Sequence, residues 1–102
     1  PYFEKTCNKI LPEEITNYPE GVSNNQELIY HMIKGANFIA KRLITSGKSI
    51  RGLLAGLIYE RLKRFNVQVT QESIAEELNV TAVTLRNRYK DIKQLVNALR
   101  SK

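Results

Sequence analysis

Three side chains near the end of the sequence, Val83, Arg86 and Lys90, have the types and the spacing of a surface that reads DNA. On a helix with about 100° between successive residues, they lie about 100° to about 160° from Leu85, which belongs to the apolar side of the same segment. A methyl-bearing side chain beside a guanidinium and an ammonium is typical of a helix that enters the major groove. A solvated basic face that includes one valine has the same spacing, so this pattern alone leaves both interpretations open.

The segment from Gln71 to Ile92 is expected to position this surface as a helix-turn-helix. Two stretches with apolar residues at helical spacing flank a break at Asn79, a residue type that tolerates the positive φ of such a turn. Thr70 and Thr81 precede the two stretches, where a hydroxyl can cap a helix. The apolar stripes consist of Ile74, the small Ala75 and Leu78 in the first helix, and of Leu85, Tyr89, Ile92, Val96 and Leu99 in the second.

Positive charge is concentrated in the part of the chain that contains this motif. The 102 residues carry sixteen Lys and Arg against ten Asp and Glu, which gives a net charge of +6 and a pI near 9.6. Residues 1–33 contain two basic and five acidic residues, whereas residues 34–102 contain fourteen basic and five acidic ones. This asymmetry favours a polyanion bound at the basic end, with the acidic end left for solvent or a protein partner.

The sequence also argues against several other classes of protein. No run of about 18 apolar residues is present, and no helix combines a basic face with a broad exposed apolar face, so we expect no membrane partner. The only cysteine, Cys7, excludes an internal disulfide and is expected to be a small core residue in a protein of a reducing compartment. The only histidine, His31, has no second titratable partner nearby. We therefore expect neither an enzyme nor a metal or cofactor site.

A Gly-Lys-Ser sequence that begins at Gly47 matches part of a nucleotide-binding loop, but this interpretation fails. A phosphate loop requires a glycine five positions before Gly47, where Arg42 stands. What remains is one helix that ends at a glycine and another that Ser49 caps. The N–H groups of that second helix, with Lys48 and Arg51, can hold a backbone phosphate. Plain helix ends with solvated charges fit the segment equally well.

The complete sequence predicts an all-α fold of five helices in a single domain, residues 1–102. The chain opens at Pro1 without a methionine, so we expect it to be a fragment of a longer protein. A capping box of Ser23 and Gln26 is expected to begin the second helix. The expected helices cover about residues 2–11, 23–43, 49–65, 70–78 and 81–99.

The segment 49–65 is the most apolar and is expected to be the central helix, surrounded by the others. Gly52 and Gly56 lower its helix propensity, which indicates that a neighbouring helix approaches closely. Its apolar residues leave almost no polar face before Glu60. The basic residues at its end, Arg61, Lys63 and Arg64, complement the helix macrodipole in any protein and are weak evidence of DNA contact.

The stretch from Thr45 to Lys90 resembles the second cyclin-type repeat of the general transcription factor IIB family, most of all its archaeal form, transcription factor B. The resemblance rests on TSGKS at 45–49, a small apolar helix that ends in Ile58-Tyr59, TQESIAEE at 70–77, and above all VTAVTLRNRYKDI at 80–92. With weaker matching in the first two helices, it covers the whole chain as one cyclin-like repeat of five helices with a C-terminal helix-turn-helix.

The resemblance implies a role at promoters. Members of this family bridge the TATA-binding protein, promoter DNA and RNA polymerase, and their second repeat reads the B-recognition element upstream of the TATA box in the major groove. On this sequence the base-reading positions fall on Val83 and Arg86. Arg86 can form a bidentate contact with a guanine, and Val83 offers methyl groups that favour a thymine methyl or exclude a wrong base. The positions implied for backbone or groove contacts, which orient the protein, are Lys48, Arg51, Thr70, Gln71, Thr81, Thr84 and Lys90.

The resemblance also implies partners and a location. The partners are double-stranded promoter DNA and the TATA-binding protein, with RNA polymerase reached through the full-length factor. The location is the cytoplasm or nucleoid of an archaeon, or the nucleus of a eukaryote.

The sequence departs from the family pattern at several positions. Ile50 stands where the family usually has a proline, Leu53, Leu54 and Gly56 replace alanines, and Asn79 replaces a common glycine. The zinc ribbon, the polymerase-reaching linker and the first repeat of the family are not within these 102 residues. Such departures fit a divergent paralogue with altered promoter preference. The alternative function is a protein-docking cyclin-type module without sequence-specific DNA binding, since the same fold elsewhere in its superfamily docks kinases or peptides.

Overall fold

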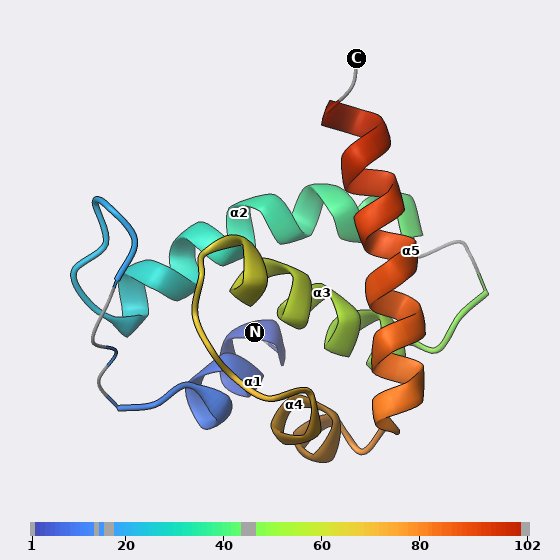
Figure 1. Ribbon diagram of the computed structural model, residues 1–102, viewed down its shortest axis with the longest axis horizontal. Helices are drawn as coiled ribbons and strands as arrows, with labels where there is room; N and C mark the ends of the chain where they lie inside the picture. The colour runs from blue at the N-terminus through green and yellow to red at the C-terminus, as the bar shows by residue number, and fades with distance from the viewer. Residues whose placement is uncertain (1, 14, 16–17, 44–46, 101–102) are drawn as a thin grey trace.

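Five helices make up the secondary structure of the computed structural model, which describes residues 2–13, 15, 18–43 and 47–100 (Figure 1). No strand occurs in these residues, so the predicted all-α, cyclin-like fold is confirmed. Residues 1, 14, 16–17, 44–46 and 101–102 lie outside the described part of the chain, and with them the first two residues of the TSGKS stretch. The helices are α1 (Tyr2–Ile10), α2 (Asn25–Leu43), α3 (Ile50–Arg64), α4 (Gln71–Leu78) and α5 (Ala82–Arg100).

The start of α2 differs from the predicted one. Asn24, not Ser23, caps the helix: its Oδ1 accepts a hydrogen bond from the backbone N–H of Glu27 at 2.9 Å, and its Nδ2 donates to Oε1 of Glu27 at 3.4 Å. The predicted capping box of Ser23 and Gln26 is therefore wrong by one residue. Asn24 and Glu27 take the two capping-box positions one residue later, and the Glu27 carboxylate accepts from the Asn24 side-chain amide.

The central position predicted for α3 is confirmed, because α3 contacts all four other helices. Ala55, Ile58 and Leu62 on α3 are at most 1% exposed. Figure 1 shows α3 in the middle of the bundle, with α5 crossing it on one side and α1 and α4 below it. Burying one large aliphatic side chain contributes about 1.5–3 kcal/mol, so this helix supplies much of the apolar stabilisation.

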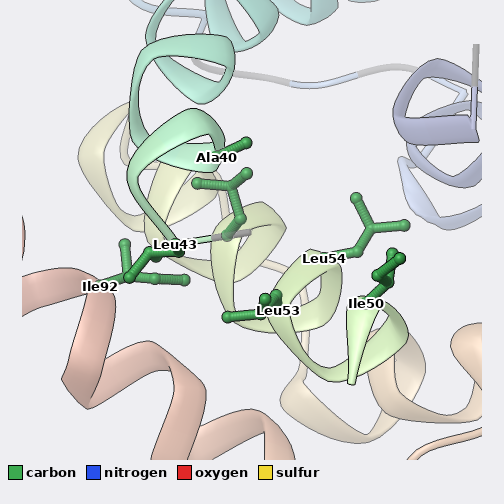
Figure 2. Close-up of a pocket in the computed structure, with 7 residues that line it drawn as sticks. Ala40, Leu43, Ile50, Leu53, Leu54 and Ile92 are labelled. Atoms are coloured by element: carbon green, nitrogen blue, oxygen red, sulfur yellow. The ribbon is translucent and has the colours of Figure 1, made fainter. Parts of the chain in front are cut away.

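The first turn of α3 is less enclosed than the sequence indicated. Ile50 is 71% exposed, and Leu53 and Leu54 are only half-buried. With Leu43 of α2 and Ile92 of α5 they line a small apolar pocket of about 110 Å³ (Figure 2). The expectation that α3 is surrounded therefore holds for its middle and its end but not for Ile50.

Two glycines let α5 lie unusually close to α3. A Cβ atom on Gly56 would be 2.7 Å from Cβ of Arg88 and 2.8 Å from the backbone nitrogen of Tyr89. On Gly52 it would be 3.0 Å from the methyl carbon of Thr84. The close helix approach predicted from these glycines is confirmed, and it fixes the face that α5 turns toward the bundle.

Gly56→Ala is expected to destabilise the fold, although alanine favours a helix by about 1 kcal/mol. The added methyl group meets the backbone of α5, which cannot rotate away, and overpacking of this kind costs about 1–3 kcal/mol. Urea unfolding followed by circular dichroism measures the change. Gly52→Ala is the matched control and should cost less, because the atoms nearest its methyl group are side-chain atoms, with the Thr84 methyl at 3.0 Å, and not backbone. A Gly56→Ala chain as stable as the wild type would contradict the close contact.

The end of α3 carries a buried ion pair. Glu60 and Arg61 are each 6% exposed, and Nε of Arg61 donates to Oε1 of Glu60 at 2.7 Å. Arg64 donates from Nε to Oε2 of the same carboxylate at 3.3 Å. Gly35 of α2 leaves room for the Arg61 guanidinium, because a Cβ atom there would overlap it. This carboxylate therefore neutralises the buried arginine beside it, although both residues have charged side chains.

Candidate nucleic-acid interface

The turn between α4 and α5 has the geometry that the sequence predicted. Asn79 adopts the left-handed conformation, with φ 56° and ψ 46°, and ends α4. Oγ1 of Thr70 accepts a hydrogen bond from the backbone N–H of Ser73 at 3.1 Å, and Oγ1 of Thr81 accepts one from that of Thr84 at 3.0 Å. Each cap satisfies a backbone donor at a helix start, so both helices begin at defined residues.

The inner face of α5 is fixed by burial. Leu85 and Ile92 are fully buried and Val96 is 7% exposed, as the apolar stripe predicted. Tyr89 is half-buried, and its ring packs edge-to-face against Tyr59 of α3 with 4.9 Å between the centroids. These contacts set the rotation of α5 about its axis, and they determine which side chains face outward.

Val83, Arg86 and Lys90 are on the outward side. All three are exposed, and Val83 is 57% exposed although it is apolar. Nη1 of Arg86 donates a hydrogen bond to Oε1 of Gln71, at the start of α4, at 3.1 Å. The structure thus brings Gln71, a residue implied to touch the DNA backbone, next to the arginine implied to read a base.

The two threonines at the start of α5 are engaged by the protein itself. Besides its cap, Thr81 donates from Oγ1 to Oγ1 of Thr84 at 3.0 Å. The methyl group of Thr84 points toward Gly52 of α3. Thr84 therefore lies at the contact between α3 and α5, on a different face of α5 from the exposed Val83. Thr84 therefore helps to seat the helix, and Thr81 defines its first turn.

Lys48 and Arg51, at the start of α3, belong to the same end of the molecule. Both are exposed, and Ser49 between them caps α3 through a hydrogen bond of 3.5 Å from the N–H of Gly52. Because Thr84 packs on Gly52, the beginning of α3 lies beside the first turns of α5 (Figure 1). Lys48 and Arg51 are therefore near the first turns of α5.

Two lysines that the sequence analysis did not select extend this basic surface. Lys93 follows Arg86 and Lys90 along α5 at the spacing of one helix face, and its Nζ lies 5.8 Å from the Tyr89 ring centroid. Nζ of Lys63 lies over the Tyr59 ring in the same way, 5.7 Å from its centroid. The spacing of residues 86, 90 and 93 was the sequence signal for Lys93. The position of Lys63 depends on how α3 and α5 cross.

Arg88 has a different role from the other basic residues of α5. Its side chain is 16% exposed, and Nε lies 3.4 Å from Oδ2 of Asp91, an ion-pair distance without hydrogen-bond geometry. It lies along Gly52 and Gly56 of α3. Arg88 is thus a packing residue, and the outward cations of α5 between residues 82 and 93 are Arg86, Lys90 and Lys93.

The described residues hold little that would favour chemistry on a substrate. Cys7 is fully buried, and burial raises the pKa of its thiol to about 12, so the reactive thiolate is scarce near neutral pH. His31 is half-buried and packs edge-to-face on Tyr30. No group of three His, Cys, Asp or Glu side chains is arranged to hold a metal ion within the described part of the chain. None of the helices α1 to α5 is long and apolar enough to cross a membrane.

Comparison with known proteins relates the sequence to one family. The family model for the transcription factor TFIIB repeat matches residues 17–95. A transcription initiation factor IIB from Ignicoccus hospitalis is 32% identical over 87 residues, which is 85% of this chain and 28% of that protein. The corresponding factor of Pyrococcus furiosus is 46% identical over 52 residues, or 51% of this chain and 17% of that protein. The chain therefore spans less than a third of the length of these relatives. No solved structure gives a significant match.

Proposed function

The chain belongs to the transcription factor TFIIB family, and on that premise we propose that it is the DNA-binding module of a basal transcription initiation factor. In this role α5 enters the major groove of the promoter element just upstream of the TATA box. The observation that carries the proposal is the outward face of α5. Val83 and Arg86 are exposed there, while Leu85 and Ile92 hold the opposite side in the bundle.

Val83 and Arg86 have the chemistry of base reading. The Arg86 guanidinium has two parallel donors for O6 and N7 of a guanine. Its hydrogen bond to Gln71 restricts the side chain before DNA arrives, so less conformational entropy is lost on binding. Val83 offers methyl groups that pack on a thymine methyl or exclude a base without one.

The surrounding cations and caps orient the duplex. Lys90 and Lys93 continue along α5 from the reading residues, and Lys48 and Arg51 project from the start of α3. Thr70 and Gln71, at the start of α4, complete the backbone contacts. Such contacts raise affinity for every sequence equally, so they position the helix without adding specificity.

The same proposal includes the partners of the longer factor. The relatives are named transcription initiation factors, and the acidic first third of this chain leaves a surface for a protein beside the DNA. We assign that role to the TATA-binding protein, with RNA polymerase recruited through other parts of the factor. The corresponding location is the archaeal nucleoid or a eukaryotic nucleus.

Titration with two duplexes, one of upstream promoter sequence and one of random sequence, tests the proposal. We expect tighter binding to the promoter duplex and a steep loss of affinity for both as salt rises. Fluorescence anisotropy at several salt concentrations measures both quantities. Absence of binding to either duplex at low salt would contradict the proposal and favour the protein-docking alternative.

Lys90→Gln and Lys93→Gln are each expected to lower the affinity for the promoter duplex and for the random duplex by the same factor. Each change removes one phosphate contact, so the slope of log K against log salt should become shallower by about 0.9 per substitution. Lys5→Gln on α1 is the matched control, since Lys5 is exposed but lies on a different helix from the interface. If either change altered the preference between the two duplexes, that lysine would not be a backbone contact.

A further inference from the structure

A second basic surface lies at the far end of α5, away from the Val83 and Arg86 face. An open cleft of about 390 Å³ forms there between α2, α3 and α5. Arg100 at this end is fourteen residues from Arg86, or about 21 Å along the helix. Figure 1 shows α5 running from beside α4 to beyond α2, so the two ends face different surroundings. A duplex on one end leaves the other accessible.

The floor of the cleft is apolar. Ile39 is 4% exposed and Val96 is 7% exposed, and the half-buried Leu99 continues this surface. Phe38 stands at the edge and is 50% exposed, which is unusual for a phenylalanine. The Arg42 guanidinium carbon lies 4.0 Å from the Phe38 ring centroid, so one face of the ring is already covered by a cation.

The walls of the cleft are positive. Arg61, Arg64 and Arg100 line it, and Arg42 adjoins it through Phe38. Glu60 is the only carboxylate paired with any of these arginines among the described residues, and it is shared by Arg61 and Arg64. Four guanidiniums and one carboxylate leave three positive charges without a counter-charge within the described part of the chain. A ligand that suits this cleft therefore combines carboxylates with branched apolar groups.

We propose that this cleft binds an acidic amphipathic peptide segment of a partner protein. One or two leucine or phenylalanine side chains of the segment fill the floor over Val96 and Leu99. Its Asp and Glu side chains pair with Arg42, Arg64 and Arg100, whose planar donors match carboxylates. A nucleic acid fits less well, because phosphates and flat bases do not fill a floor of branched aliphatic side chains and one face of Phe38 is occupied.

A fluorescent 15-residue helical peptide with Leu and Phe on one face and Asp and Glu on the other is the probe. Two control peptides have the acids replaced by Asn and Gln, or the same residues in scrambled order. We expect the 102-residue chain to bind the acidic amphipathic peptide at least tenfold more tightly than either control. Rising salt should weaken this binding.

Two pairs of variants distinguish the cleft from general basicity. Phe38→Ala and Arg100→Glu are expected to weaken peptide binding about tenfold or more. Tyr30→Ala and Lys34→Glu should leave it within about twofold. The control pair is closely matched, because Nζ of Lys34 lies 4.7 Å from the exposed Tyr30 ring on the same helix but outside the cleft. Circular dichroism confirms that each variant is folded, and promoter-duplex affinity of Phe38→Ala should be unchanged.

Three results would overturn the proposal. The first is equal binding of the acidic peptide and its uncharged or scrambled control. The second is loss of binding in the Tyr30 and Lys34 variants to the same degree as in the cleft variants. The third is tighter, Phe38-dependent binding of a single-stranded oligonucleotide, which would assign the cleft to nucleic acid.

Discussion

Glu60→Ala is expected to lower the free energy of unfolding by about 3–5 kcal/mol, because it leaves the Arg61 guanidinium buried without its counter-charge. The side chains of Glu60 and Arg61 are only 7% and 8% exposed, so water replaces the lost carboxylate poorly. Urea denaturation followed by circular dichroism gives the value. A loss below about 1 kcal/mol would mean that Arg61 reaches solvent easily and that the pair is not a structural element.

Two further variants distinguish the effect of the unpaired charge from the effect of lost packing. Arg64→Ala should cost only about 0–1 kcal/mol, because the Arg64 side chain is 33% exposed and its pairing with Glu60 is partly screened. The double change Glu60→Leu with Arg61→Met should recover most of the stability, since it removes both charges and keeps the volume. If the double variant were as unstable as Glu60→Ala, the loss would come from packing and not from an unpaired charge.

Arg86→Ala is expected to weaken promoter binding by about 1–3 kcal/mol, or about 5-fold to about 150-fold, with a smaller effect on a random duplex. The reason is the loss of a bidentate contact to one base. Gln71→Ala should lower the preference for promoter DNA by a smaller factor, because it removes the hydrogen bond of 3.1 Å that orients Arg86. Anisotropy titrations with both duplexes give the ratio of affinities. An equal loss on both would make Arg86 a backbone contact.

The helix-turn-helix could be predicted from sequence because its determinants are local. The hydroxyls of Thr70 and Thr81 each accept from the backbone N–H three residues later, and Asn79 acts through its own left-handed backbone. The apolar period of α5 specifies its inner face. The exposure of Val83 and Arg86 follows from that period. Their role on DNA remains a proposal.

Features that depend on neighbouring helices were not predictable in the same way. Burial of Arg61 requires Gly35 of α2 beside its guanidinium, and no property of the α3 sequence indicates this. Ile50 was expected in the core because it is apolar, yet no described helix covers it. The predicted start of α2 was early because two adjacent residues, Ser23 and Asn24, are both of a type that caps helices, and Asn24 is the one that does so.

The same distinction applies within the candidate interface. Thr84 has the sequence position of a groove contact, and its methyl group packs toward Gly52 of α3 while its hydroxyl bonds to Thr81, so its role on DNA remains a proposal. Lys93 was recognisable from its spacing to Lys90. The Tyr59 and Tyr89 contact that links Lys63 to the same surface depends on the crossing of α3 and α5. Periodicity therefore gives the direction of a side chain, whereas tertiary contacts decide whether it is available.

The claim that α5 reads bases is tested most directly by the sequences that wild-type, Val83→Ala and Arg86→Ala chains select from a library of random duplexes. We predict that the wild type selects a motif with a required guanine and that Arg86→Ala loses this requirement at one position only. Val83→Ala should relax a neighbouring position, and the rest of the motif should persist in both variants. Selection of the same motif by all three chains, or of no motif by a wild-type chain that binds DNA at low salt, would contradict the account.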